Sequence, residues 1–147
     1  MRYSSAIVLA CIAAACHSTP SEAELTFLVT ASVAPTTFRV GDVATVTVTI
    51  ENRGSKAVNL FTCPAWFEVL KGESVVAPGT QICAASWLGT TLEPGASYAH
   101  SVEWRGDTRS LSNPPTFLDP GRYVLRPAVR VEASTYRGPA SGVELTH

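Results

Sequence analysis

Histidine and cysteine carry much of the chemistry available to a chain, and this one has few of either: three histidines and four cysteines among 147 residues. Nucleophilic catalysis needs a serine or cysteine within reach of a base that a third group orients. His17 follows an apolar N-terminal segment and His147 is the last residue, so His100 is the one histidine expected to point inward. Because His100 alternates with Tyr98 and Val102, we expect a half-buried, hydrogen-bonded side chain and no catalytic residue.

Sequence motifs for cofactor or metal binding are missing as well. The chain has no G-x-S-x-G elbow, no Walker or Rossmann glycine pattern, no H-E-x-x-H pair and no EF-hand loop. Asp42, Glu93, Asp107 and Asp119 stand beside glycines or prolines, where carboxylates stabilise turns. We therefore expect no enzyme activity, no cofactor and no bound metal.

Cys63 and Cys83 are the two cysteines expected in the folded part, since Cys11 and Cys16 belong to the N-terminal segment. A metal site is the competing interpretation, but the chain has no C-x-x-C pair and His100 is the one internal histidine nearby. In an oxidising compartment a lone pair of cysteines usually forms a bridge. The sequence predicts a Cys63–Cys83 disulfide, which would contribute about 3 kcal/mol by closing a loop of about 20 residues.

The first 15 residues are organised like an export signal. Arg2 supplies a positive start, and residues 6–15 (AIVLACIAAA) form a continuous apolar run. A run of about 10 residues suits a signal peptide and falls short of the ~20 that span a bilayer. We predict a signal peptide at residues 1–15.

The end of this segment, three alanines before Cys16, resembles the lipobox of bacterial lipoproteins. Cleavage before Cys11 is disfavoured because it would leave only about five apolar residues upstream. Ordinary secretion after cleavage before Cys16 is the alternative. The resemblance implies lipidation at Cys16 and, because residue 17 is not Asp, an anchor in the outer membrane facing the periplasm or the surface. Residues 16–24 would then form a tether reaching at most ~30 Å.

Residues 25–147 have an apolar pattern with a period of two, best seen where Ala44, Val46, Val48 and Ile50 alternate with threonines. Other strands are expected at residues 25–33, 56–62, 66–71, 81–87, 98–104, 123–131 and 143–146. No segment after the signal has a convincing helical period. We predict a single domain, an all-β, immunoglobulin-like antiparallel β-sandwich of about 7–9 strands.

The run Asp119-Pro120-Gly121-Arg122-Tyr123 fits the D-x-G-x-Y entry to a strand in an immunoglobulin-like tyrosine corner. There the tyrosine hydroxyl bonds back to the backbone a few residues upstream. We predict this structural role for Asp119, Gly121 and Tyr123. A Pro-Gly turn followed by an ordinary core tyrosine is the alternative.

Three segments together resemble the BsuPI-type intracellular proteinase inhibitor domain family: residues 46–58 (VTVTIENRGSKAV), 92–104 (LEPGASYAHSVEW) and 120–126 (PGRYVLR). The similarity covers roughly residues 38–131. It implies an immunoglobulin-like fold, an inhibitor-like activity and a protease as partner, and it supplies no reactive-site residue. The chain departs from that family in its export signal and its two central cysteines.

Charge gives little indication of a nucleic-acid partner, because the formal net charge is -1 and no stretch is rich in lysine or arginine. The nearest approach to a basic patch is three arginines spaced four apart, which share one face of a strand. We expect a salt-bridged, solvated face in preference to an anion site. The arginines are Arg122, Arg126 and Arg130, with Glu51, Glu68 and Glu103 as candidate neighbours.

Two further features have an ordinary structural interpretation. Arg105-Gly106-Asp107 spells the integrin-binding tripeptide, but Gly-Asp is a common turn pair. The aromatic residues near the cysteines are expected to pack in the core around the bridge, with an exposed binding patch as the alternative. They are Phe61, Trp66, Phe67 and Trp87.

These observations together predict a non-catalytic cell-envelope lipoprotein that binds an unidentified protein through loops such as residues 105–119 or through a sheet edge. Under the family resemblance the partner would be a protease. The membrane would be contacted through the N-terminal lipid only. The alternative is a structural accessory subunit of an envelope assembly, which a long exposed edge strand would favour and a blunted edge would not.

Overall fold

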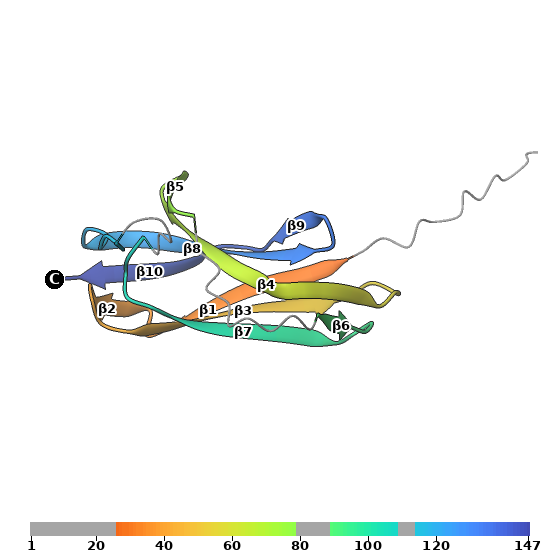
Figure 1. Ribbon diagram of the computed structural model, residues 1–147. Helices are drawn as coiled ribbons and strands as arrows, with labels where there is room; N and C mark the ends of the chain where they lie inside the picture. Colours follow the sequence, from red (N-terminus) through yellow and green to blue (C-terminus); the bar gives the residue numbers. More distant parts are fainter. Residues whose placement is uncertain (1–25, 79–88, 109–113) are drawn as a thin grey trace, which may run out of the picture.

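The computed structural model describes residues 26–78, 89–108 and 114–147, which form a two-layer β-sandwich (Figure 1). The predicted all-β, immunoglobulin-like fold is confirmed, with ten strands among the described residues. The strands beyond the predicted seven to nine are short ones of three or four residues. Their bounds are β1 (Phe27–Ala34), β2 (Thr37–Arg39), β3 (Ala44–Asn52), β4 (Val58–Lys71), β5 (Ser74–Ala77), β6 (Thr90–Leu92), β7 (Ser97–Trp104), β8 (Gly121–Val131), β9 (Ser134–Arg137) and β10 (Ser141–Thr146). The described residues contain no helix long and apolar enough to cross a membrane.

The smaller sheet has the strand order β1-β3-β7, and all its pairs are antiparallel. Its central strand β3 alternates strictly, with Val46 and Val48 buried and the threonines between them facing outward. The predicted alternation therefore sets which face of this sheet enters the core.

The larger sheet has seven strands in the order β2-β10-β8-β4-β5, with β6 on β4 and β9 on β8. Its pairs are antiparallel except β10 with β2, which is parallel. Figure 1 shows that β1 begins at one end of the sandwich and β10 ends at the other.

Strand β4 corrects one sequence prediction. The sequence predicts separate strands at residues 56–62 and 66–71, but residues 58–71 form one strand of 14 residues, and residues 56 and 57 precede it. The register with β8 shifts between Leu60 and Ala65, and Cys63 within that stretch has a positive φ of 56°. Between these two pairs β4 has three residues more than β8, and this irregularity interrupts the alternation without ending the strand. The expected strand at residues 81–87 lies outside the described residues.

The core centres on Trp104, the last residue of β7, which is only 1% exposed. Its ring meets Phe38 of β2 and Phe67 of β4 edge to face, with centroids 5.6 and 5.8 Å apart. Its indole N–H donates to the carbonyl of Asp107 at 2.9 Å, so the polar atom of this buried ring is satisfied. One side chain thereby joins both sheets and the loop that follows β7.

The N-x-G turn after β3 is held by the fully buried side chain of Asn52. Its amide N–H groups donate to the carbonyls of Lys56 and Leu92, at 2.8 and 2.9 Å. Its side-chain oxygen accepts from the N–H of Gly54 at 3.0 Å. A single amide therefore fixes the crossing from the smaller sheet to β4 and ties it to β6.

Candidate functional site

The outer face of the larger sheet carries a compact charged cluster in which two arginines share one carboxylate. Arg126 of β8 directs both Nε and Nη2 to Oε2 of Glu68 on β4, at 2.7 Å each. Arg137 of β9 donates from Nη2 to Oε1 at 3.1 Å and from Nε to Oε2 at 3.3 Å. The side chain of Glu68 is 11% exposed, whereas the side chains of Arg126 and Arg137 are 34% and 46% exposed. The largely buried carboxylate of Glu68 thus positions the side chains of Arg126 and Arg137, which are partly exposed on this face of the sheet.

Burial of Glu68 acts to raise the pKa of its carboxyl group, but the hydrogen bonds and positive charges of Arg137 and Arg126 outweigh it. The pKa therefore lies below its usual value, and Glu68 is ionised at neutral pH. The same contact raises the pKa of Arg137. Since each guanidinium has five N–H donors, both arginines keep donors beyond the ones directed at Glu68.

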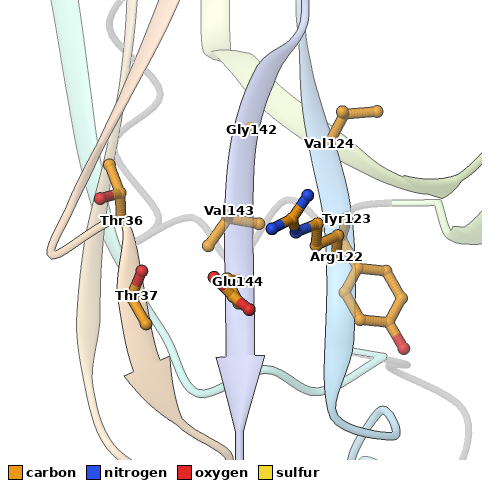
Figure 2. Close-up of a pocket in the computed structure, with 8 residues that line it drawn as sticks. All are labelled: Thr36, Thr37, Arg122, Tyr123, Val124, Gly142, Val143 and Glu144. Atoms are coloured by element: carbon orange, nitrogen blue, oxygen red, sulfur yellow. The ribbon is translucent and has the colours of Figure 1, made fainter.

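Beside this cluster, the same face has an open hollow of about 360 Å³ across β2, β10 and β8 (Figure 2). Gly142 of β10 leaves space at its centre, because a Cβ there would meet no atom within 4 Å. Thr36 and Thr37 line one side and Arg122 the other, with Glu144 between them on β10. The lining offers a cation, a carboxylate and two hydroxyls, and none of its residues is a histidine or cysteine.

The predicted residues of the tyrosine corner meet before β8. The hydroxyl of Tyr123 donates to the carbonyl of Asp119 at 2.7 Å, and the ring is buried. Gly121 between them has a φ of 149°, a value that glycine adopts without strain. This is the hydrogen bond that defines a tyrosine corner, and it lies where the chain enters the larger sheet from β7.

The predicted cysteine sites are described only in part. Cys63 is disulfide-bonded and half-buried within β4. Cys83 and the lipidation site Cys16 lie outside the described residues, so the pairing of Cys63 with Cys83 and the lipid anchor remain predictions. Of the four aromatics expected near the bridge, Phe67 is buried in the core and Trp66 is half-buried. Trp87 and the side chain of Phe61 lie outside the described set.

His100 is half-buried on β7, and no hydrogen bond or ion pair links its side chain to another described residue. The expected hydrogen bond is therefore not observed, and the described part of the chain places no carboxylate in contact with this imidazole. Nor do the described histidines, cysteines and carboxylates gather anywhere in a group of three or more that could hold a metal.

The tripeptide Arg105-Gly106-Asp107 is built into the fold. Arg105 donates from Nη1 to the carbonyl of Gly41 at 3.1 Å. Gly106 packs against Leu145, and its carbonyl accepts from the N–H of Leu118 at 2.8 Å. The tripeptide forms the base of the loop between β7 and β8, in agreement with the turn interpretation.

The outer edge of β7 is the longest strand edge without a partner among the described residues. The N–H of Asn52 donates to the carbonyl of Ala96, which fixes the phase of the β3–β7 ladder. Because hydrogen-bonding direction alternates along a strand, Tyr98, His100 and Val102 face β3. The N–H and C=O groups of the alternate residues point outward; these are Ser97, Ala99, Ser101 and Glu103.

The opposite edge of this sheet, β1, is protected. The hydroxyl of Ser141 donates to the carbonyl of Ala31 at 2.9 Å. Gly138 lies so close to the carbonyl of Val29 that a Cβ on it would overlap that oxygen. The edge strands of the larger sheet, β2 and β5, are only three and four residues long. Short or covered edges resist pairing with other chains, which leaves β7 as the exception.

No protein-family description matches the chain, and no curated protein matches it. Among solved structures, an alkylpurine DNA glycosylase, AlkC of Pseudomonas fluorescens bound to DNA containing an abasic site analog, has a TM-score of 0.56 and 16% identity. That match covers 85% of this chain and 32% of the glycosylase. The sporulation control protein Spo0M of Bacillus subtilis follows with a TM-score of 0.53 and 10% identity, covering 82% of this chain and 49% of Spo0M.

The β-glucosidase EmGH1 of Erythrobacter marinus gives a TM-score of 0.52 and 13% identity, over 83% of this chain and 16% of the enzyme. The chain therefore spans half or less of each of these proteins. Two of the three are enzymes, but similarity at such low identity shows the fold alone.

Sequence reasoning found Arg126 and Glu68 as neighbours and missed Arg137. The other two expected partners belong to the smaller sheet: Glu51 pairs with Arg53 at 3.2 Å, and Glu103 lies on β7. Arg137 reaches Glu68 because a two-residue turn with Glu132 at a φ of 51° folds β9 back onto β8. Glutamate followed by alanine gives no turn signal, so only the outward alternation of Thr135 and Arg137 could have suggested it.

Proposed function

We propose that this chain is a lipid-anchored cell-envelope protein whose immunoglobulin-like sandwich is a non-catalytic binding module. In this proposal an extended segment of a partner protein pairs with the outer edge of β7. The unpartnered edge is the single observation that carries the proposal. Eight residues without a register shift present four outward N–H and C=O pairs, enough for a strand of matching length to add to the sheet.

Export and anchoring in the outer membrane are supported by the signal-like residues 1–15 and the lipobox-like alanines before Cys16. The non-catalytic part of the proposal rests on the sequence, which has no G-x-S-x-G elbow and no H-E-x-x-H pair. An inhibitor-like activity against a protease is a specific version of the proposal. It is supported by the resemblance of residues 46–58, 92–104 and 120–126 to the BsuPI-type family.

The same edge supports the second candidate function, a structural accessory subunit of an envelope assembly. Both functions use β7, and they differ in what occupies it. A free-standing module exchanges its partner, whereas an assembly subunit is recovered with the same neighbour at fixed stoichiometry.

The test of the edge uses Ala99→Pro. The N–H of Ala99 points away from β3, so proline removes an outward donor without breaking the ladder inside the sheet, a position that edge strands tolerate. Ala99→Thr is the matched control, because it keeps the N–H. We expect partners cross-linked to the wild-type chain in its native envelope to be lost with Ala99→Pro and retained with Ala99→Thr.

Hydrogen exchange gives an independent measurement of the same edge. Without a partner, the amides of Ser97, Ala99, Ser101 and Glu103 should exchange faster than those of Tyr98, His100 and Val102, and they should become protected in the complex. Uniform protection along β7 in the isolated chain, or capture that Ala99→Pro leaves unchanged, would contradict the proposal. A panel of proteases assayed in parallel tests the inhibitor version.

A further inference from the structure

The two outer faces of the sandwich carry opposite charge. On the larger sheet, alternation turns five arginines outward, against two glutamates, Glu68 and Glu144. On the smaller sheet the outward positions carry Glu51 and Glu103 and no lysine or arginine. The five arginines, called the basic face below, are Arg39, Arg122, Arg126, Arg130 and Arg137.

Five cations against two anions leave this face with a net charge of +3, in a chain whose total is -1. On the smaller sheet Glu51 is ion-paired with Arg53 at 3.2 Å, so Glu103 is its one outward carboxylate without an ion pair among the described residues. Glu68 is the only carboxylate that forms an ion pair with these arginines among the described residues. Arg122 and Glu144 are neighbours in the β8–β10 register, yet they form no ion pair. Arg39 donates from Nε to the main-chain oxygen of His147 at 2.8 Å, so Arg122 and Arg130 are the two arginines of this face without a side-chain hydrogen bond or ion pair among the described residues.

The arrangement of these charges is broad and open. Arg122, Arg126 and Arg130 stand four residues apart on β8, or about 13 Å between neighbours at a strand rise of 3.3 Å. Arg39 and Arg137 extend the face sideways onto β2 and β9. Every cation is arginine, whose planar guanidinium forms bidentate hydrogen bonds with phosphate. Their spread across three strands, β2, β8 and β9, fits an extended layer of phosphates better than one acidic peptide.

We infer that the basic face lies against an anionic phospholipid surface. The inference rests on the proposed function in one respect, the anchor at Cys16, because a tether of at most ~30 Å keeps the domain near a membrane. It adds a second membrane contact to the lipid predicted from the sequence. Each arginine near an anionic bilayer contributes a modest attraction that salt screens.

This orientation leaves the smaller sheet accessible to a partner protein. With the basic face on the phospholipid headgroups, the smaller sheet and its acidic residues face away from the membrane. The open edge of β7 belongs to that sheet, so docking on lipid and binding of a partner segment would not compete.

The test uses residues 17–147, without the signal and without Cys16, so that lipidation contributes nothing. All described strands and the whole described core lie within this chain. Binding is measured on vesicles of phosphatidylcholine with and without 30% phosphatidylglycerol at low salt. We expect binding to the anionic vesicles alone, lost on adding about 0.5 M salt, at which the Debye length is only a few ångströms.

The variant Arg122→Gln/Arg130→Gln removes two exposed cations that take no part in the Glu68 cluster. We expect its partition coefficient on anionic vesicles to fall about 25-fold, at about fivefold for each charge. The matched control is Arg53→Gln/Lys56→Gln, which removes two cations from the turn between β3 and β4 and should bind like the wild type.

Equal binding by both double variants would overturn the inference, as would equal binding to both kinds of vesicle. Binding to a DNA duplex without binding to anionic vesicles would assign the face to nucleic acid and would overturn it too. Since none of these measurements involves β7 or a protein partner, a failure here is distinct from a failure of the proposed function.

Discussion

The hydroxyl of Tyr123 donates a part-buried hydrogen bond to the carbonyl of Asp119, while the ring of Tyr123 is buried. Tyr123→Phe keeps the buried ring and leaves that carbonyl without its partner. We expect the free energy of unfolding to fall by about 1–2 kcal/mol, as measured by denaturant titration. Tyr98→Phe is the control, because Tyr98 is half-buried on β7 and its hydroxyl forms no hydrogen bond with another described residue. Equal losses in the two variants would contradict the corner's contribution.

Glu68 gives the stability of the domain a defined dependence on pH. Its pKa is lower in the folded chain than in the unfolded one, so its ionised form stabilises the fold above the unfolded value of 4.5. That contribution is lost as pH falls through the lower, folded pKa.

Glu68→Gln should abolish this contribution while keeping the shape of the side chain. We expect a loss of about 1–3 kcal/mol at pH 7, and a smaller difference from the wild type below pH 4. Thermal or chemical unfolding between pH 3 and 7 measures both. A constant difference across that range would show that the charge of Glu68 is not what stabilises the cluster.

At the scale of the strands, the protected edge of β1 depends on the close approach of Gly138 to Val29. In Gly138→Ala the new methyl group would overlap the carbonyl oxygen of Val29, and the linker between β9 and β10 would have to move away from β1. We expect a loss of about 2 kcal/mol or more in the free energy of unfolding.

Gly142→Ala is the matched control for this change. A methyl group there meets no atom within 4 Å and points into the hollow of Figure 2, so its effect should stay within about 1 kcal/mol. Similar losses in both variants would mean that the close contact at Gly138 is not a constraint on the fold.

Strands β3 and β8 could be predicted from sequence because each has enough residues to show a period of two, whereas the irregularity in β4 divided the longest strand into two predicted ones. Strands β3 and β8 alternate over nine and eleven residues, and the predicted boundaries lie within two residues of those observed. Strands β2, β5, β6 and β9 have three or four residues, too few to distinguish alternation from chance. Their partners in the sheet, not their own sequence pattern, determine that they are strands.

The candidate sites could likewise be predicted where their residues are close together in the sequence, and not where they are far apart. The tyrosine corner lies within five consecutive residues, so its pattern could be recognised directly. The Glu68 cluster joins residues 58 and 69 positions apart, and the basic face adds Arg39, which reaches the sheet through a parallel pairing of β2 with β10. A net charge of -1 conceals this face, because composition does not record which side of a sheet a residue occupies.

At the scale of the whole molecule, the unequal sheets give the sandwich two different sides. The seven-stranded side is basic and has short edges, while the three-stranded side is acidic and has the open edge of β7. If both proposals hold, the domain is oriented by its charge and binds its partner on the side away from the lipid.

The ends of the chain have a mechanical consequence. Strand β1 begins at one end of the sandwich and β10 ends at the other, so a pull between an anchored N-terminus and a load at the C-terminus runs along the strands (Figure 1). The eight-residue ladder of β1 with β3 would then be loaded in shear, with its hydrogen bonds sharing the tension instead of opening one after another. A force applied between Phe27 and Thr146 would thus be resisted by many of these hydrogen bonds at once.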